Sequence, residues 1–329
     1  MNIEALFEKI KTLKIAVVGD VMLDNYIYGN VNRLSPEAPV PIIEVYKKES
    51  RLGGAANVAL NLQALGATPL LISVIGRDNE AKMVESLLTD MYIETMGMLN
   101  SDDRKTTVKT RIIGNKAQIA RIDQEVKHNL SAADNERLIS TFSNIIAHCD
   151  ALILEDYDKG ILNPISIAAI IEIARNQGKI VAVDPKYNNF LHYKGVTLFK
   201  PNLKELTLGL KENLDEDYSI ESIFNLEDKL RAELGHEIGL ITLSERGVLI
   251  KSKSENHTAM AHQRNIADVS GAGDTVISVA TCVLACGEKL ATVAELSNLA
   301  GGLVCEQPGV MPINKADLIK EIKRTKVLD

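Results

Sequence analysis

The sequence predicts an α/β fold in which a mostly parallel central sheet is flanked by helices. Short apolar runs alternate along the chain with segments of helical periodicity, and this alternation is typical of a parallel sheet with helices on both faces. The composition, with 46% hydrophobic and 25% charged residues, is that of a globular protein with a sizeable core. Because only 4% of the residues are aromatic, we expect that core to be aliphatic.

Five apolar runs are expected to form buried parallel strands: 14–20, 69–76, 151–156, 179–184 and 239–244. The clearest helical patterns cover 57–66, 80–91 and 164–178. Asp20, Asp156 and Asp184 stand at the ends of three of the strands. Since ligands of open α/β sheets bind at the carboxyl ends of the strands, we expect these three acids to converge.

Two segments, 25–50 and 104–124, interrupt this alternation. Both combine alternating β-branched residues with turn residues. We interpret them as two insertions that together form a small β lid; the alternative is an extension at the edge of the main sheet. The C-terminal segment 313–329 is expected to be a solvated amphipathic helix with a structural role.

Charge and composition exclude several classes of protein. The net charge of −7 and the lack of a basic run argue against nucleic-acid binding. No uncharged apolar run approaches the roughly 20 residues of a membrane span, and the N-terminus does not resemble a signal peptide, so we expect a cytoplasmic protein. Without a CxxC pair, the cysteines are expected to be buried hydrophobes rather than metal ligands or disulfides: Cys149, Cys282, Cys286 and Cys305.

The segment DVSGAGDT at 268–275 carries the clearest chemical signal. A glycine-rich turn that runs into an apolar helix points backbone N–H groups and the positive helix end at one spot, which suits an anion. Asp274 is unfavourable beside an anion unless it must accept a proton there, so the pattern indicates a base next to a phosphate and favours phosphoryl transfer. The alternative is an ordinary glycine-rich loop in which Asp274 caps the helix.

Two further segments offer groups that can hold a sugar. In 51–66, Gly53 and Gly54 permit close backbone approach, and the Asn57 amide can donate to and accept from hydroxyls; the alternative is a helix start capped by Asn57. In GDVMLD at 19–24, two carboxylates follow the first strand and can accept hydrogen bonds from a polyol, although a lone Asp there more often makes a turn or a helix cap.

Two more segments are weaker signals for a nucleotide. In 200–206, Asn202 and Glu205 stand three apart and can orient a water on Mg²⁺ or a phosphate oxygen; the alternative is a helix capping box. The strand-to-turn transition TLSERG at 242–247 is suited to lining a nucleotide.

Taken in order, GGAANVAL at 53–60 and DVSGAGDT at 268–275 resemble the two signatures of the ribokinase-like sugar kinases, the PfkB family. The resemblance covers nearly the whole chain and implies a single ribokinase-like domain over 1–329. Residues 19–45, together with RIDQE, DYDKG, DPK and PNLKEL further along, are similar to the bacterial D-glycero-β-D-manno-heptose 7-phosphate kinases. Many of those are fused to a nucleotidyltransferase; because no HxGH motif occurs here, the resemblance implies the stand-alone kinase of ADP-heptose synthesis for lipopolysaccharide core or a surface polysaccharide.

The resemblance implies a role for each matching residue. Asp274 would deprotonate the anomeric 1-hydroxyl, and the N–H groups of Gly271, Ala272 and Gly273 would meet the charge on the γ-phosphoryl group. The residues implied to bind the sugar are Asp20, Gly53, Gly54 and Asn57, and we expect Asp24, Arg111, Arg121, Asp123 and Lys186 to join them at the substrate. The cations considered for the 7-phosphate, because they fall in the lid or at a strand end that faces the crevice, are Lys186, Arg104, Arg111 and Arg121. The residues implied around ATP are Asn202, Glu205, Ser244, Gly247, Gly271 and Gly273, with Glu205 holding Mg²⁺ through water and Asp268 marking a site for K⁺.

The same resemblance implies the partners. These are ATP and a sugar phosphate, with a homodimer formed through the lid. The chain departs from the heptose-kinase pattern at Glu155, where Ser is usual, and at Ser270, where Thr is usual. Two alternatives stay open: a kinase of this family for another sugar, such as a fructose phosphate or ribose, and a non-catalytic sensor of sugar or nucleotide.

Overall fold

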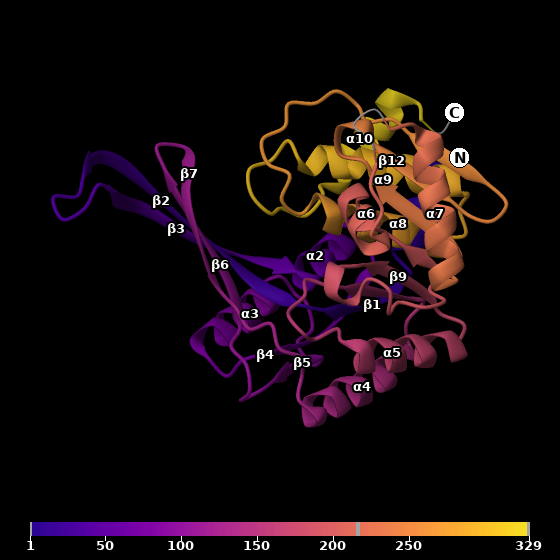
Figure 1. Cartoon of the computed structure of the whole chain (residues 1–329), viewed down its shortest axis with the longest axis horizontal. Helices are drawn as coiled ribbons and strands as arrows, with labels where there is room; N and C mark the ends of the chain where they lie inside the picture. The colour runs from indigo at the N-terminus through magenta and orange to yellow at the C-terminus, as the bar shows by residue number, and fades with distance from the viewer. Residues whose placement is uncertain (1, 215–217, 328–329) are drawn as a thin grey trace.

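Two sheets organise the chain in the computed structural model, which describes residues 2–214 and 218–327. Within these residues one sheet has nine strands in the order β13-β12-β11-β10-β9-β8-β1-β4-β5, and the other has four in the order β3-β2-β6-β7. Helices surround the first sheet, while the second projects from the body of the molecule (Figure 1). Met1, residues 215–217 and the last two residues of the predicted C-terminal helix lie outside the described residues.

The large sheet is parallel from β11 through to β5, and β12 and β13 extend it as antiparallel strands. Its strands are β1 (Lys14–Gly19), β4 (Thr68–Ile75), β5 (Met98–Asn100), β8 (Ala151–Glu155), β9 (Ile180–Asp184), β10 (Leu198–Phe199), β11 (Ile238–Thr242), β12 (Val248–Lys251) and β13 (Asn256–Ala259). All five predicted strands are confirmed. With the helices around it, the sheet gives the α/β architecture that the alternation of patterns predicts.

Helices pack on both faces of this sheet. One hydrophobic cluster joins it to α1 (Ile3–Ile10), α2 (Ala55–Leu65), α3 (Asn79–Asp90), α8 (Ala272–Ala285), α9 (Leu290–Val304) and α10 (Lys315–Thr325). The other joins it to α4 (Ala132–Ile146), α5 (Pro164–Asn176), α6 (Leu203–Leu210) and α7 (Ile220–Leu234). Ile15 and Val17 of β1 belong to the first cluster and Ala16 and Val18 to the second, because successive side chains of a strand point to opposite faces.

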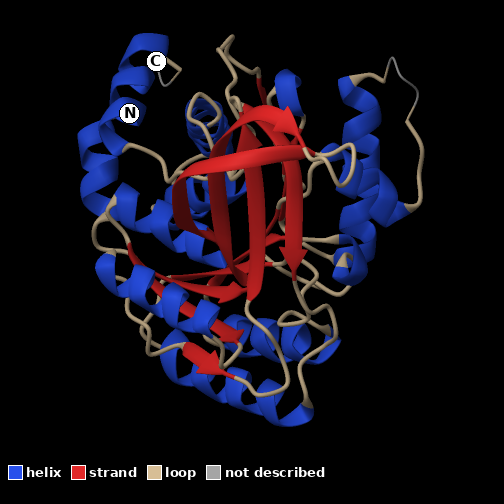
Figure 2. Ribbon diagram, turned by 90° about the vertical axis from the view of Figure 1, so that its left-hand side faces the viewer, coloured by secondary structure: helices blue, strands red, loops and turns tan. Residues whose placement is uncertain are grey.

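The four-stranded sheet contains both segments that interrupt the predicted alternation. Its strands are β2 (Val21–Leu34), β3 (Pro41–Gly54), β6 (Thr107–Gly114) and β7 (Ala117–Gln124). β2 pairs antiparallel with β3 and parallel with β6, and β6 and β7 form a hairpin. Seen from its own side, this sheet stands in front of the helices (Figure 2). The segments therefore meet in a separate sheet rather than extending the edge of the large one; the action of this sheet as a lid stays a prediction.

The acids at the ends of β1, β8 and β9 lie together at the carboxyl ends of these central strands of the large sheet. The backbone N–H of Asp20 donates to the carbonyl of Glu155, and that of Asp156 donates to the carbonyl of Asp184. The predicted convergence is confirmed, and all four side chains are buried. Among the described residues no helix combines the length and apolar character of a membrane span. Each of the four cysteines is a free thiol, and Cys286 alone of the four is partly exposed.

Candidate active site

The glycine-rich turn ends at the start of α8. Gly271 is the N-cap residue and has φ 82°, in the left-handed region that favours glycine. A Cβ on Gly271 would also lie 3.0 Å from the Asn57 amide nitrogen. The N–H groups of the first helical turn have no acceptor within the helix, and no side chain caps them. The N–H of Ala272 donates to the carbonyl of Val269 at 3.3 Å, so those of Gly273 and Asp274 are the ones available to an anion, together with the positive end of the helix.

Asp274 lies on this first turn and is 3% exposed. One carboxylate oxygen accepts from the Asn57 amide at 2.7 Å, and the other accepts from the Tyr157 hydroxyl at 2.8 Å. Burial raises the pKa of Asp274 to about 6; the two hydrogen bonds oppose this rise, and the charge of Asp184 adds to it. Asp274 is therefore an oriented carboxylate whose pKa suits proton acceptance near neutral pH.

A buried polar network holds the Asn57 amide in place. Asn57 is 0% exposed on the first turn of α2, and its carbonyl accepts from the Asn61 amide at 2.8 Å. The Asn61 oxygen accepts in turn from the Thr275 hydroxyl of α8 at 2.9 Å. The network links α2 to α8, so that Asn57 presents a donor to Asp274. The direct contact of Asn57 with a sugar stays a prediction.

The two glycines before α2 are required by their surroundings. Gly54 has φ 61°, and a Cβ there would lie 2.2 Å from the backbone oxygen of Asp20. A Cβ on Gly53 would lie 2.2 Å from the Asp24 carboxylate, which forms an ion pair with Arg111. The Gly–Gly pair therefore lets α2 begin directly against β2, close to the Asp24–Arg111 ion pair.

Asp20 holds a turn, the alternative that stood beside a sugar role, although the turn is the one after β8. It is 1% exposed, and one of its oxygens accepts from the backbone N–H groups of Tyr157 and Lys159, at 2.8 and 3.2 Å. Burial and the neighbouring Asp156 raise its pKa to about 6. Its carboxylate is thus directed at the turn after β8 rather than at an open site. Asp20 positions this turn, which carries the tyrosine that reaches Asp274.

Two lysines face the acids at the ends of β8 and β9. Lys200 forms a 2.8 Å ion pair with Asp184, and Lys186 lies 3.5 Å from Asp184 and 2.9 Å from Glu205. Burial alone would raise the pKa of Asp184, but the two lysines more than offset this and hold the carboxylate ionised. A Cβ on Gly273 would meet this ion pair at 3.4 Å, so the start of α8 lies against it.

Asn202 and Glu205 form the capping box that stood as the alternative to a metal role. The Asn202 side chain accepts from the Glu205 N–H at 2.8 Å, and the Glu205 side chain accepts from the Asn202 N–H at 2.9 Å. Because Glu205 also accepts from Lys186, both of its oxygens have a donor. The capping geometry is confirmed, while the contact of Glu205 with Mg²⁺ through water stays a prediction.

The basic residues chosen from the sequence for a phosphate differ in their availability. Arg104 is 8% exposed and its guanidinium donates to the carbonyl of Lys159, so it contacts the turn after β8, and its contact with a phosphate stays a prediction. Arg121 makes two hydrogen bonds to Asp123, at 2.8 and 2.9 Å, on the exposed strand β7. Arg111 stays at the site, paired with Asp24 and stacked 5.4 Å from the Tyr26 ring.

Lys109 is a site residue that the sequence analysis missed. Its ammonium lies 5.3 Å from the centre of the Tyr157 ring, and burial lowers its pKa. Among the ion pairs of the described residues, none involves Lys109. The signal in the sequence is its spacing from Arg111, since residues two apart on a strand share a face. The pairing of β6 with β2, which brings Lys109 beside Asp24, is visible only in the structure.

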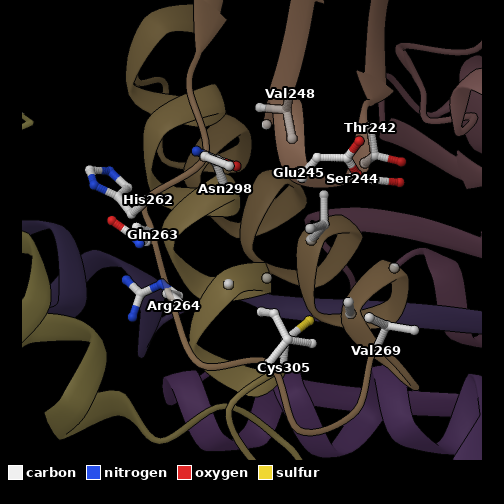
Figure 3. Close-up of a pocket in the computed structure, with 18 residues that line it drawn as sticks. Thr242, Ser244, Glu245, Val248, His262, Gln263, Arg264, Val269, Asn298 and Cys305 are labelled. Carbon is white, nitrogen blue, oxygen red and sulfur yellow. The ribbon is translucent and has the colours of Figure 1, made fainter.

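A cavity of about 720 Å³ lies beside the N-terminus of α8 (Figure 3). Ser244 and Gly247 line it at the β11–β12 turn, and Ala272 and Gly273 line it at the start of α8. Figure 3 shows Val248 and Val269 among the apolar groups of its wall and Asn298 among the polar ones. Its volume lies within the range of small-molecule sites. It brings the TLSERG segment, which the sequence analysis assigned to a nucleotide, beside the glycine-rich turn, which it assigned to an anion.

Asp268 links the glycine-rich turn to the loop around Gly309 by hydrogen bonds. Its two oxygens accept from the backbone N–H groups of Ser270 at 2.9 Å and Gly309 at 3.1 Å. In the same loop the carbonyls of Pro308 and Val310 accept from Arg51. Asp268 therefore fixes the approach to α8, and its part in binding K⁺ stays a prediction.

Comparisons with known proteins agree with this architecture. Residues 12–316 match the family model described as pfkB family carbohydrate kinase. The bifunctional protein HldE of Desulfatibacillum aliphaticivorans is 38% identical over 94% of this chain, and that of Coxiella burnetii (strain Dugway 5J108-111) is 39% identical over 95%. The chain covers 63% and 64% of the length of these two relatives, less than two thirds.

Solved structures share the fold at low sequence identity. Phosphofructokinase-2 from Escherichia coli in complex with potassium has a TM-score of 0.78 and 16% identity, over 96% of this chain and 100% of that one. Arabidopsis thaliana ribokinase complexed with ribose and ATP has a TM-score of 0.73 and 17% identity, over 94% and 99%. The predicted ribokinase-like fold is confirmed. Because the family model matches residues 12–316, which include every strand of the large sheet, the chain belongs to the pfkB family of carbohydrate kinases.

Proposed function

We propose that this kinase transfers the γ-phosphoryl group of ATP to the anomeric 1-hydroxyl of D-glycero-β-D-manno-heptose 7-phosphate, giving the 1,7-bisphosphate used in ADP-heptose synthesis. The observation that carries the transfer is the place of Asp274. It is an oriented, buried carboxylate on the first turn of a helix whose free N–H groups border a cavity of nucleotide size. The heptose specificity is supported by the sequence resemblance of residues 19–45 and of the RIDQE, DYDKG and DPK segments.

In the proposed reaction Asp274 accepts the proton of the sugar hydroxyl. The hydroxyl oxygen forms a bond to the γ-phosphorus, the bond from that phosphorus to the β–γ bridging oxygen breaks, and ADP leaves. Burial raises the pKa of Tyr157 well above its usual value, so its hydroxyl stays protonated and donates to Asp274. The N–H groups at the start of α8 stabilise the charge of the transferred group. ATP would occupy the cavity beside Ser244 and Gly247.

The acids at the ends of β8 and β9 fit Mg²⁺, because carboxylate oxygens are its preferred ligands and those of Glu155 have no hydrogen-bond partner. Asp184 and, through water, Glu205 would hold it, and when bound it neutralises phosphate charge. We include K⁺ beside Asp268 as part of the proposal. It is supported by the fold shared with a phosphofructokinase-2 solved in complex with potassium.

We further propose that Lys109 and Arg111 bind the 7-phosphate. Both lie on β6, where Lys109 contacts the Tyr157 ring and Arg111 pairs with Asp24, and a phosphate would supply the counter-charge that Lys109 lacks. Lys186 stays a candidate for the same phosphate, although its ammonium already faces Asp184 and Glu205. Arg121 and Asp123 satisfy each other on β7 and are weaker candidates.

The four-stranded sheet is proposed to close over the sugar and to pair with a second copy of the chain. Every residue of β7 is exposed, and so are several large apolar side chains of this sheet: Leu34, Val45, Tyr46, Ile119 and Ile122. An exposed strand of this kind favours association at its edge. Sedimentation velocity over a range of concentrations tests the pairing, and a chain that stays monomeric throughout contradicts it.

A coupled ADP-release assay with ATP and a small panel of sugars tests the function. The panel is heptose 7-phosphate, the free heptose, fructose 6-phosphate and ribose. We expect the highest kcat/KM with heptose 7-phosphate. Preference for another sugar would retain the kinase and reject the heptose assignment. No ADP release with any sugar, in a chain that binds them, would favour the sensor alternative.

A further inference from the structure

Three carboxylates that come from separate elements face one another at the carboxyl ends of the central strands of the large sheet. Glu155 ends β8, Asp184 ends β9 and Asp274 lies on the first turn of α8. One oxygen from each lies within 4.8 Å of the others. This is the spacing at which oxygen ligands surround a single cation.

Glu155 is the unexplained member of the group. Its side chain is 0% exposed, and neither of its oxygens has a hydrogen-bond partner. One oxygen of Asp184 also lacks a hydrogen bond and has only the Lys186 ammonium nearby, at 3.5 Å. A buried carboxylate without a partner is costly, because desolvation is not repaid by any donor. The oxygens of Glu155 are closed to solvent, so a compensating group there must be small.

The charges around Glu155 are unbalanced. Four carboxylates lie in this cluster, those of Glu155, Asp184, Asp274 and Glu205, against the two ammonium groups of Lys186 and Lys200. With every group ionised, two negative charges remain. A divalent cation would cancel them, and it would also give the oxygens of Glu155 their missing partner.

We propose that Glu155, Asp184 and Asp274 form a divalent-cation site that binds Mg²⁺ or Mn²⁺ with no nucleotide present. Glu155 and Asp184, which hold the unpartnered oxygens, contact the ion directly, since hard oxygen ligands match both metals. Asp274 adds its negative charge and stays free to accept the sugar proton. The site goes beyond the proposed function, in which Asp184 and, through water, Glu205 hold the Mg²⁺ that neutralises phosphate charge, because it makes Glu155 a ligand and fills without nucleotide. The site depends on Glu155. The heptose kinases that the sequence resembles usually have Ser at this position, so chains with that Ser would lack this ligand.

Binding of Mn²⁺ to the full chain, without nucleotide or sugar, tests the proposal. Free Mn²⁺ is followed by electron paramagnetic resonance, and the melting temperature is measured in parallel. We expect one Mn²⁺ per chain, a melting temperature that rises with Mn²⁺, and at least a tenfold loss of affinity in Glu155→Ser. Competition by Mg²⁺ is expected at the same site.

Glu227→Gln is the matched control. Glu227 is also 0% exposed with one oxygen lacking a partner, but it lies on α7 beside Arg231 and His236. Its replacement should leave Mn²⁺ binding unchanged. If Glu155→Ser does not fold, Glu155→Gln keeps the shape and gives the same comparison.

Two results would overturn the site: no Mn²⁺ binding by the wild-type chain without nucleotide, or equal affinity in a folded Glu155 variant. Either would mean that Glu155 does not hold a divalent cation. Because no substrate is present, neither result bears on the sugar-kinase assay, and the two proposals fail separately.

Discussion

The two sheets of this kinase differ in how deeply their strands are buried. Every residue of β8 in the large sheet is buried between two hydrophobic clusters, whereas every residue of β7 in the small sheet is exposed. Asp184 and Glu155 come from the large sheet, and Asp24, Lys109 and Arg111 come from the small one. The proposed phosphoryl transfer thus rests on a fully packed scaffold, and the proposed sugar selection rests on a sheet whose outer strand can change at little cost in stability.

We expect the largest effect, on the free energy of unfolding, from a substitution that creates a cavity in the large sheet. Ile153 of β8 is 0% exposed, and Ile153→Ala removes packed atoms that its neighbours cannot replace. We expect the free energy of unfolding to fall by about 2–5 kcal/mol in urea titrations. A loss below about 1 kcal/mol would mean that this sheet is not the rigid part of the molecule.

The small sheet should govern binding of the phosphorylated sugar. In Lys109→Ala we expect KM for heptose 7-phosphate to rise at least about tenfold with kcat nearly unchanged, because a charge-assisted contact of about 1.5–3 kcal/mol is lost. The KM for the unphosphorylated heptose should not change. Lys48→Ala, an exposed lysine on β3, is the control. Equal KM values in wild type and Lys109→Ala would remove Lys109 from the phosphate site.

The pH profile should report the base at the start of α8, which packs on the large sheet. Burial raises the pKa of Asp274 to about 6, and the base must be ionised to accept a proton. Therefore kcat/KM should be level above about pH 7 and should fall towards tenfold per pH unit below about pH 6. A profile that stays level down to pH 4.5, in protein shown to be folded there, contradicts this assignment.

The smallest effect should follow the same substitution in the small sheet. Ile122 on β7 is 57% exposed, so Ile122→Ala should change the free energy of unfolding of dilute protein by less than about 0.5 kcal/mol. The comparison with Ile153→Ala uses one residue type in two sheets. A loss in Ile122→Ala as large as in Ile153→Ala would show that the outer strand is packed in solution.

Local patterns in the sequence account for much of this fold. The five buried strands and the glycine-rich turn were predictable because apolar periodicity and glycine spacing act over a few residues. The antiparallel strands β12 and β13 were missed, since each has only four residues and β13, NHTA, is mostly polar. The tasks of Asp20, Tyr157 and Lys109 depend on which strands and turns lie side by side. Glu155 stood out as a departure from a motif, but its burial without a partner follows only from packing.

The central claim is that Asp274 is the base of a sugar kinase, and Asp274→Asn tests it most directly. Asparagine keeps the shape and cannot accept the proton. We predict that kcat for heptose 7-phosphate falls by at least about 10², while the dissociation constant of the sugar phosphate, measured by calorimetry, stays within a few fold of wild type. Near-normal turnover in Asp274→Asn would contradict the account.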